Sequence, residues 1–246
     1  MIPVPLDPGT TALLVIDVQN DYVDPNGALG RAGADMTACV RMIPRLERFL
    51  AAAREAGVFV VHTRNWHRPE TDSEAWRDRL DRSGSWADRP GQAGTWGAEP
   101  YRIEPRDGEE VIRKFRYDAF LGTNLEYLLR ARRIRTLVCT GVTTNVCVES
   151  TARAAHMRDF HVVLVEDCCA STEPELHQAT VENVRRHFGV IASAADLEAA
   201  WRVSPASDAL VMSPKDQAPA DPSAGSPPQS ARDAVARSRA RATPRG

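Results

Sequence analysis

The sequence predicts an α/β protein in which a parallel sheet is covered by helices on both faces. Short apolar runs alternate with helical segments along most of the 246 residues. Strands of a parallel sheet with two buried faces have such unbroken apolar runs, whereas strands with one wet face alternate apolar and polar residues. The alternation of strands with helices is typical of three-layer α/β folds. A chain of this length holds one large α/β domain or two small ones.

Each element follows from the local pattern. Strands are predicted from short runs rich in Val, Ile, Leu and Thr, at residues 11–17, 58–63, 109–114, 135–141, 161–167 and 190–194. Helices are predicted where apolar residues recur at helical spacing, and the first of them ends at Gly57. The predicted helices cover residues 36–57, 121–133, 145–157, 174–188 and 196–201.

Two regions depart from this alternation. Residues 64–107 form a long insertion that holds four of the five tryptophans: Trp66, Trp76, Trp86 and Trp96. Long ordered loops are often lids or binding loops, while the plainer interpretation is that these rings pack the loop onto the domain or a partner subunit. Residues 203–246 are rich in Pro, Ser, Ala and Arg and almost lack large apolar residues. This composition predicts a disordered tail, which follows a folded domain of residues 1–202.

The composition argues against several classes of partner. Apolar residues make up 43% of the chain, charged residues 26%, and the net charge is -2. Nothing in this balance favours binding to nucleic acid or to an anionic membrane. The first residues lack the basic and apolar regions of a signal peptide, and no apolar stretch approaches the ~18 residues of a spanning helix. We therefore expect a cytoplasmic protein without nucleic-acid or membrane partners.

The cysteines predict buried, reduced thiols rather than a disulfide framework. Their number is odd and none falls in a C-x-x-C pair: Cys39, Cys139, Cys147, Cys168 and Cys169. In a reducing compartment such residues are small, mostly buried apolar side chains. At most one or two of them need a chemical explanation.

Three chemically complementary residues stand at predicted strand ends. Asp17 ends the first strand, Lys114 ends the third, and Cys147 follows the fourth within a short turn. Alone, each has a plainer interpretation: a turn or cap residue, a solvated lysine and a core thiol. Because a parallel sheet brings the carboxyl ends of its strands to one edge, we expect the three side chains to converge there.

Together the three residues predict covalent catalysis by Cys147. The pKa of a thiol falls beside a cation or at the N-terminus of a helix, and this thiol is predicted to have both, through Lys114 and the turn. Asp17 would take the thiol proton and deliver it to a leaving amine. Unpaired backbone N–H groups at the helix start would hold a developing oxyanion, with Thr144 or Asn145 as the N-cap.

The motifs DVQND after the first strand, K-x-x-Y-x-x-F after the third and GVTTNVCVES after the fourth resemble the isochorismatase-like cysteine hydrolases. The resemblance covers about residues 13–194. It implies a doubly wound, Rossmann-like fold with a six-stranded parallel sheet. It also implies that Cys147 is the nucleophile, Asp17 the acid and base, and Lys114 the third member of a catalytic triad.

The resemblance further implies the structure of the nucleophile turn and the class of reaction. It predicts a cis peptide bond between Val142 and Thr143 and an oxyanion hole made by the N–H groups of Thr143 and Cys147. Family members that cleave the vinyl ether of isochorismate lack the cysteine. Cys147 therefore favours attack on an amide or ureido carbonyl, an acyl-enzyme, and release of ammonia or an amine. The alternatives are a vinyl-ether hydrolase and a non-catalytic member of the fold.

The region after the second strand bears on metal binding. Nicotinamidases of this family hold a metal with an Asp and two His residues. Here Asn65 takes the place of the Asp, His67 matches the first His, and no second His follows nearby. We therefore predict no metal and no cofactor, and a nicotinamidase-type reaction ranks as an alternative. A plainer interpretation of His62 and His67 is a strand-end residue and a loop residue.

The substrate is predicted only as a class. The segment HTRxxHRP resembles biuret hydrolase, and NVCVEST resembles ureidoacrylate amidohydrolase, both of which act on small ureido or carbamoyl compounds. We expect a small ureido, carbamoyl or carboxamide substrate and, from the resemblance, a homo-oligomer. The predicted substrate-binding residues are Gln19, Tyr22, Arg64, Asn65, Trp66 and Tyr117.

Overall fold

The computed structural model describes residues 2–83 and 89–203. All of them belong to one compact unit of the chain, Met1–Ser207. The predicted tail, apart from Val203, lies outside the described residues, and so does Trp86.

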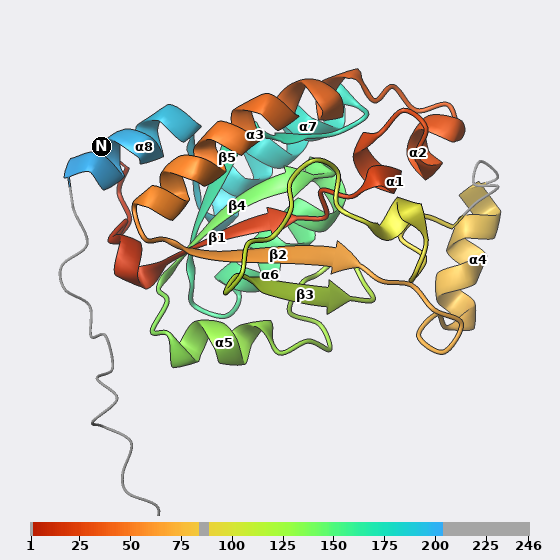
Figure 1. Cartoon of the computed structure of the whole chain (residues 1–246), viewed down its shortest axis with the longest axis horizontal. Coiled ribbons are helices and arrows are strands. Elements are labelled where there is room, and N and C mark those ends of the chain that lie inside the picture. Colours follow the sequence, from red (N-terminus) through yellow and green to blue (C-terminus); the bar gives the residue numbers. More distant parts are fainter. Residues whose placement is uncertain (1, 84–88, 204–246) are drawn as a thin grey trace, which may run out of the picture. The chain divides into compact units, whose positions relative to one another are not determined.

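The centre of the fold is a six-stranded, all-parallel sheet (Figure 1). Its strands are β1 (Thr11–Ile16), β2 (Phe59–Asn65), β3 (Glu110–Lys114), β4 (Thr136–Val142), β5 (His161–Ala170) and β6 (Val190–Ala192). They lie in the order β3-β2-β1-β4-β5-β6. This is the order of a doubly wound sheet, in which the chain reverses direction across the sheet between β1 and β4. The predicted fold class is confirmed.

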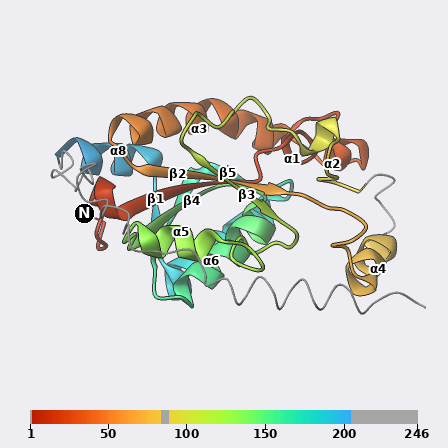
Figure 2. The ribbon, with the colours of Figure 1, turned by 60° about the horizontal axis from the view of Figure 1, so that its bottom comes forward.

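Helices cover both faces of the sheet because each central strand has two apolar faces. In β1, Leu13 and Val15 belong to the core under α3 (Thr37–Glu55) and α8 (Ala194–Val203). Leu14 and Ile16 belong to the opposite core, under α5 (Leu125–Ala131), α6 (Glu149–His156) and α7 (Pro174–Asn183). Figure 2 shows the sheet nearly edge-on between α3 and α8 on one side and α5 and α6 on the other.

Other elements precede β1 or lie in the segments that connect the strands. They are η1 (Pro8–Thr10), α1 (Asn20–Val23), α2 (Ala28–Arg31), α4 (Glu74–Ser83), η2 (Trp96–Ala98), η3 (Thr144–Val148) and η4 (Val184–Phe188). α4 stands beyond the ends of β2 and β3 (Figure 1). Within the described ranges, no helix combines the length and apolar character needed to cross a membrane.

The predicted elements and the observed ones differ mainly at their ends. β2 continues through Arg64 to Asn65, and β5 continues to Ala170 after a register shift opposite residues 139–141. The helix predicted at residues 121–133 covers only Leu125–Ala131. The insertion predicted at residues 64–107 contains α4 and η2. Neither α1 nor α2 was predicted, because four residues are too few to establish a helical period.

All five cysteines are buried free thiols, as predicted. Cys139 lies in the middle of β4 with no exposed surface, and burial raises its pKa to about 12. The ordinary pKa of a thiol in an unfolded chain is about 8.5. Cys139 therefore contributes stability that is fully present below pH ~8.5 and is lost as the pH rises toward 12.

We expect Cys139→Ala to flatten the loss of stability at high pH. Between pH 7 and pH 10 the buried thiol should account for about 2 kcal/mol of the fall in unfolding free energy, because only the unfolded thiol ionises. Urea unfolding at the two pH values measures the difference. Val138→Ala, a neighbouring and equally buried position, is the control: it should lower stability at both pH values and keep the full pH dependence. If Cys139→Ala and the parent lost equal stability between the two pH values, the buried Cys139 thiol would not be the source of the pH dependence.

Candidate active site

The structure brings the three predicted catalytic residues together at the carboxyl edge of the sheet. Asp17 follows β1 directly, Lys114 is the last residue of β3, and Cys147 lies in the π-helical turn η3 after β4. Lys114 Nζ is 2.7 Å from Asp17 Oδ2 and 3.5 Å from Cys147 Sγ. Asp17 and Lys114 have no exposed surface, and Cys147 is 4% exposed. The expected convergence of strand ends therefore places a buried ion pair directly beneath a thiol.

Asn65 is a fourth member of this cluster. Its Nδ2 donates to Asp17 Oδ2 at 2.9 Å and to Cys147 Sγ at 3.6 Å. Its Oδ1 accepts from Lys114 Nζ at 2.9 Å. The parallel register that pairs Asn65 with Lys114 brings the two side chains side by side. We predicted Asn65 as a substrate-binding residue, but its carboxamide binds all three members of the cluster.

Further hydrogen bonds satisfy the buried charges. Thr63 Oγ1 donates to Asp17 Oδ1 at 2.7 Å, and the backbone N–H of Asp17 donates to the Thr63 carbonyl. Lys114 Nζ also donates to the carbonyl of Arg116 at 2.9 Å. A desolvated ion pair is stable only when such bonds use its remaining donors and acceptors. The cluster meets that condition with partners from β2 and from the loop after β3.

The electrostatics keep Lys114 charged and Cys147 protonated. Burial lowers the pKa of Lys114, but Asp17 and Cys147 raise it by more, so the net pKa is raised. Burial raises the pKa of Cys147 to about 12, while Lys114 lowers it and Asp17 raises it. We predicted that Lys114 and the helix start would acidify this thiol. The prediction was wrong for the ligand-free site because burial and the Asp17 carboxylate outweigh the lysine.

The nucleophile turn contains a cis peptide bond between Val142 and Thr143 and continues as one π-helical turn into α6. Thr144 and Asn145 were predicted as N-cap candidates, but neither caps this turn. Thr144 Oγ1 is 2.9 Å from Nδ1 of His177, and Asn145 Oδ1 accepts from Ser171 Oγ at 2.8 Å. Thr144 therefore anchors the turn to α7, and Asn145 anchors it to the segment that joins β5 to α7.

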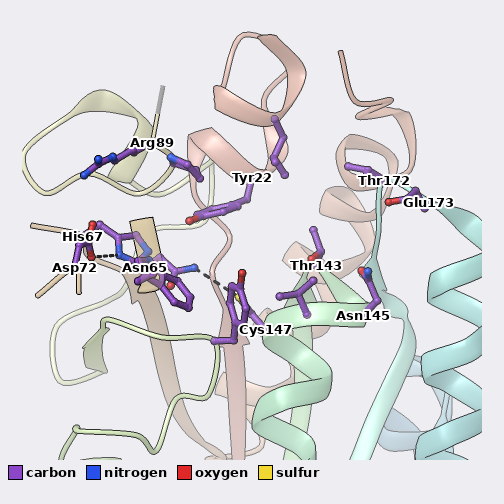
Figure 3. Close-up of a pocket in the computed structure, with 15 residues that line it drawn as sticks. Tyr22, Asn65, His67, Asp72, Arg89, Thr143, Asn145, Cys147, Thr172 and Glu173 are labelled. Carbon is purple, nitrogen blue, oxygen red and sulfur yellow. Dashed lines mark hydrogen bonds and ion pairs between the residues drawn. The ribbon is translucent and has the colours of Figure 1, made fainter. Parts of the chain in front are cut away.

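A cavity of about 190 Å³ opens above the cluster. Figure 3 shows Cys147 and Asn65 at its base, with His67 and Asp72 on one side and Thr172 and Glu173 on the other. The cavity is smaller than the ~300–1,000 Å³ of pockets that take drug-sized ligands, which suits a small substrate. Its lining residues are Tyr22, Leu29, Asn65, His67, Asp72, Trp76, Arg89, Pro90, Tyr117, Thr143, Asn145, Val146, Cys147, Thr172 and Glu173.

Of the six predicted substrate-binding residues, Tyr22, Asn65 and Tyr117 line the cavity and the other three do not. The Gln19 carboxamide donates to the carbonyls of Asn65 and Ala98 and accepts from the Asn65 N–H. It therefore holds the end of β2 in place, whereas we predicted that Gln19 binds the substrate.

Arg64 and Trp66 also lie away from the cavity. The Arg64 guanidinium is 3.4 Å from Glu99, and the Trp66 ring packs under Arg113 at 4.5 Å. The physical reason is the alternation of side chains along an extended segment: when Asn65 faces the cluster, its two neighbours face the other way. Both residues were predicted to bind the substrate, and neither lines this cavity.

Several lining residues were not predicted as site residues. Trp76 and Asp72 come from the insertion, and Glu173 comes from the segment after β5. The sequence feature that pointed to this region was the tryptophan content of the insertion. It suggested a lid or a packed loop but did not indicate which tryptophan lines the cavity. Trp76 lines the cavity, whereas Trp96 is 54% exposed. Among residues 2–83 and 89–203, no three His, Cys, Asp or Glu side chains gather as a metal site would require.

A family model, the isochorismatase domain, matches residues 11–196. The chain therefore belongs to the isochorismatase family, in agreement with the resemblance of its motifs.

Among its relatives are amidohydrolases. Ureidoacrylate amidohydrolase RutB of Methylobacterium radiotolerans is 36% identical over 82% of this chain and 83% of its own length. RutB of Agrobacterium fabrum is 34% identical over 79% of this chain and 91% of its own length.

Solved structures show the same fold. An isochorismatase family protein from Desulfovibrio vulgaris has a TM-score of 0.67 and 33% identity, covering 78% of this chain and 98% of its own. N-carbamoylsarcosine amidase from Thermoplasma acidophilum has a TM-score of 0.62 and 26% identity, covering 75% of this chain and 96% of its own.

We expect Gly141→Ala to damage both stability and the site. Gly141 has a φ of 110°, and a Cβ there would lie 2.1 Å from the carbonyl oxygen of Ile16, the residue before Asp17. Gly122→Ala is the matched control: Gly122 has a φ of 69°, and a Cβ there would meet no atom of the described residues within 4 Å. Backbone strain alone costs about 1–3 kcal/mol.

Urea unfolding and turnover, measured well below the melting temperature, separate the two glycine variants. Gly141→Ala should lose more stability than Gly122→Ala and should also lose activity, because the displaced Ile16 carbonyl carries Asp17 with it. Equal losses in the two variants would show that close packing at residue 141 does not position the cluster.

Proposed function

We propose that this chain is a cysteine amidohydrolase that cleaves a C–N bond of a small ureido, carbamoyl or carboxamide compound and releases ammonia or an amine. The observation that carries the proposal is the buried Asp17–Lys114–Asn65 cluster beneath Cys147, at the base of a small cavity. The names of its ureidoacrylate and N-carbamoylsarcosine relatives support the same class of substrate. Homo-oligomerisation and a cytoplasmic location stay predictions.

The first step is proton transfer coupled to attack. Because the pKa of the thiol is raised to about 12, little thiolate exists before the substrate is bound. As Cys147 Sγ forms a bond to the substrate carbonyl carbon, its proton passes to the Asp17 carboxylate, which interacts with the thiol directly. Lys114 keeps its proton and stabilises the negative charge that develops on sulfur and then on the carbonyl oxygen.

In the remaining steps Asp17 again carries the proton. The tetrahedral oxyanion is held by the N–H groups of Thr143 and Cys147 at the rim of the turn. It collapses with cleavage of the C–N bond, and the leaving nitrogen takes the proton from Asp17. A water molecule then attacks the thioester and gives a proton to Asp17, which returns it to the Cys147 sulfur as the acid product forms.

The alternatives fit the site less well. A vinyl-ether hydrolase would have no use for Cys147, whose side chain lines the cavity. A nicotinamidase-type site of the metal-binding kind would need a ligand at residue 65, and Asn65 is instead bonded to Asp17, Lys114 and Cys147. A non-catalytic member of the fold has no reason to bury a matched ion pair under a thiol.

We expect Cys147→Ala to abolish ammonia release. Ammonia is measured enzymatically on a panel of ureas, N-carbamoyl amino acids and carboxamides, and the loss should exceed about a thousand-fold, because removing a nucleophile removes the covalent route. Cys39→Ala, another buried thiol that lies outside the cavity, is the control and should keep the parent rate. Ammonia release by Cys147→Ala at the parent rate would refute the covalent mechanism.

A second prediction separates thiol reactivity from catalysis. Asp17 raises the pKa of Cys147, so Asp17→Asn should lower that pKa and speed alkylation of Cys147 by iodoacetamide at pH 7.5. The same variant should lose ammonia release, because no group remains to carry the proton. Mass spectrometry of the alkylated peptide over a pH series measures the first effect. Slower alkylation of Asp17→Asn than of the parent would contradict the role of Asp17.

A further inference from the structure

A second buried pair, His67 and Asp72, lies on the cavity wall and takes no part in the proposed mechanism. His67 Nδ1 is 2.9 Å from Asp72 Oδ1, and the two residues are 8% and 5% exposed. Both line the same cavity as Cys147, and Figure 3 shows them beside Asn65. From the sequence, His67 matched the first metal-binding His of the nicotinamidases, with a loop residue as the plainer interpretation.

The partner of Nδ1 fixes which ring nitrogen of His67 is an acceptor. A carboxylate accepts hydrogen bonds and cannot donate them, so Nδ1 carries the proton that binds Asp72. In the neutral ring, Nε2 is then an acceptor with a free lone pair. Burial lowers the pKa of His67, Asp72 raises it, and Lys114 and Arg116 lower it, with a net lowering. The ring is therefore neutral at pH 7 and above.

The ring is also held in one place. The backbone N–H of His67 donates to the Gly91 carbonyl at 2.8 Å, and its carbonyl accepts from the Ala93 N–H at 3.0 Å. Its imidazole stacks on Trp76 with ring centroids 5.6 Å apart. Trp76 in turn lies under the Arg116 guanidinium and against Tyr117. A buried acceptor fixed in this way favours ligands that donate to it, because an unpaired polar group costs binding free energy.

We propose that Nε2 of His67 accepts a hydrogen bond from a substrate N–H, so that the enzyme selects ureido compounds over the matching carboxamides. The inference rests on the proposed function and narrows its substrate class. A ureido group, R–NH–CO–NH₂, carries an N–H on the side of the carbonyl away from the leaving nitrogen. In the matching carboxamide, R–CH₂–CO–NH₂, that position is a methylene, which leaves the His67 acceptor unpaired. Sites that bind a polar group reject analogues lacking it.

The test compares three isosteric pairs that differ only in this N–H. They are N-methylurea with propionamide, N-carbamoylglycine with succinamate, and N-carbamoyl-β-alanine with glutaramate. The readout is the ratio of kcat/KM for the ureido member to that for the carboxamide member. Because the ratio is compared between enzyme variants, the lower intrinsic reactivity of a ureido carbonyl cancels.

His67→Leu should lower this ratio by about 10-fold to 100-fold, mainly through a higher KM for the ureido member. His67→Gln, which keeps an acceptor near the position of Nε2, should retain most of the ratio. His62→Leu is the matched control: His62 is also buried and bonded to a carboxylate, Glu109, at 2.8 Å, but it does not line the cavity. Its ratio should equal that of the parent.

The outcomes separate this inference from the proposed function. If His67→Leu keeps the parent ratio while Cys147→Ala abolishes hydrolysis of both members, the inference is wrong and the amidohydrolase assignment stands. If the parent enzyme hydrolyses the carboxamides but none of the ureido compounds, the inference is also wrong, and the amidohydrolase assignment again stands. If Cys147→Ala hydrolyses both members at the parent rate, the proposed function itself is wrong.

Discussion

The ion pair between Lys114 and Asp17 is the interaction on which the arrangement of the active edge depends. Its two side chains have no exposed surface and their charged atoms are 2.7 Å apart. Removing two charges from water costs several kcal/mol for each, and loss of one partner of a buried pair typically costs about 3–5 kcal/mol. The pair is therefore stable only if every strand that contributes to it keeps its register.

The sheet supplies that register. Ile16 pairs with Thr63 and with Gly141 in the neighbouring strands, and Asn65 pairs with Lys114. A shift of one residue in any of these strands would turn its side chains to the opposite face. The apolar cores on both faces of the sheet thus hold the ion pair together. The same burial raises the pKa of the Cys147 thiol, and a buried, protonated thiol resists oxidation.

The sequence predicted those site residues whose position follows from the order and direction of the strands. Asp17, Lys114 and Cys147 could be predicted because strand ends in a parallel sheet must meet, whatever the details of packing. The role of Asn65 was less accessible, because it depends on β2 extending two residues beyond its apolar run, to the point where Asn65 faces the cluster. The direction of the Cys147 pKa shift was inaccessible, because burial is a property of the folded chain and a turn motif does not reveal it. The pairing of His67 with Asp72 likewise depends on a turn in which the Asp72 N–H donates to the Arg68 carbonyl.

The DVQND motif connects the Asp17–Lys114–Asn65 cluster to the insertion that forms part of the cavity wall. Asp21 is buried, and its carboxylate accepts from the N–H groups of Ala28 and Gly91. Gly97 packs so closely on the same carboxylate that a Cβ there would lie 2.1 Å from Asp21 Oδ2. Asp21 therefore binds the later part of the insertion, and Gly91 lies next to Tyr22 and Asn65, two residues that line the cavity. These anchors use backbone groups and glycines, so they do not involve the side chains of His67 and Trp76, which line the cavity. The sheet register thus positions the cluster, and the insertion supplies part of the cavity wall above it, including His67 and Trp76.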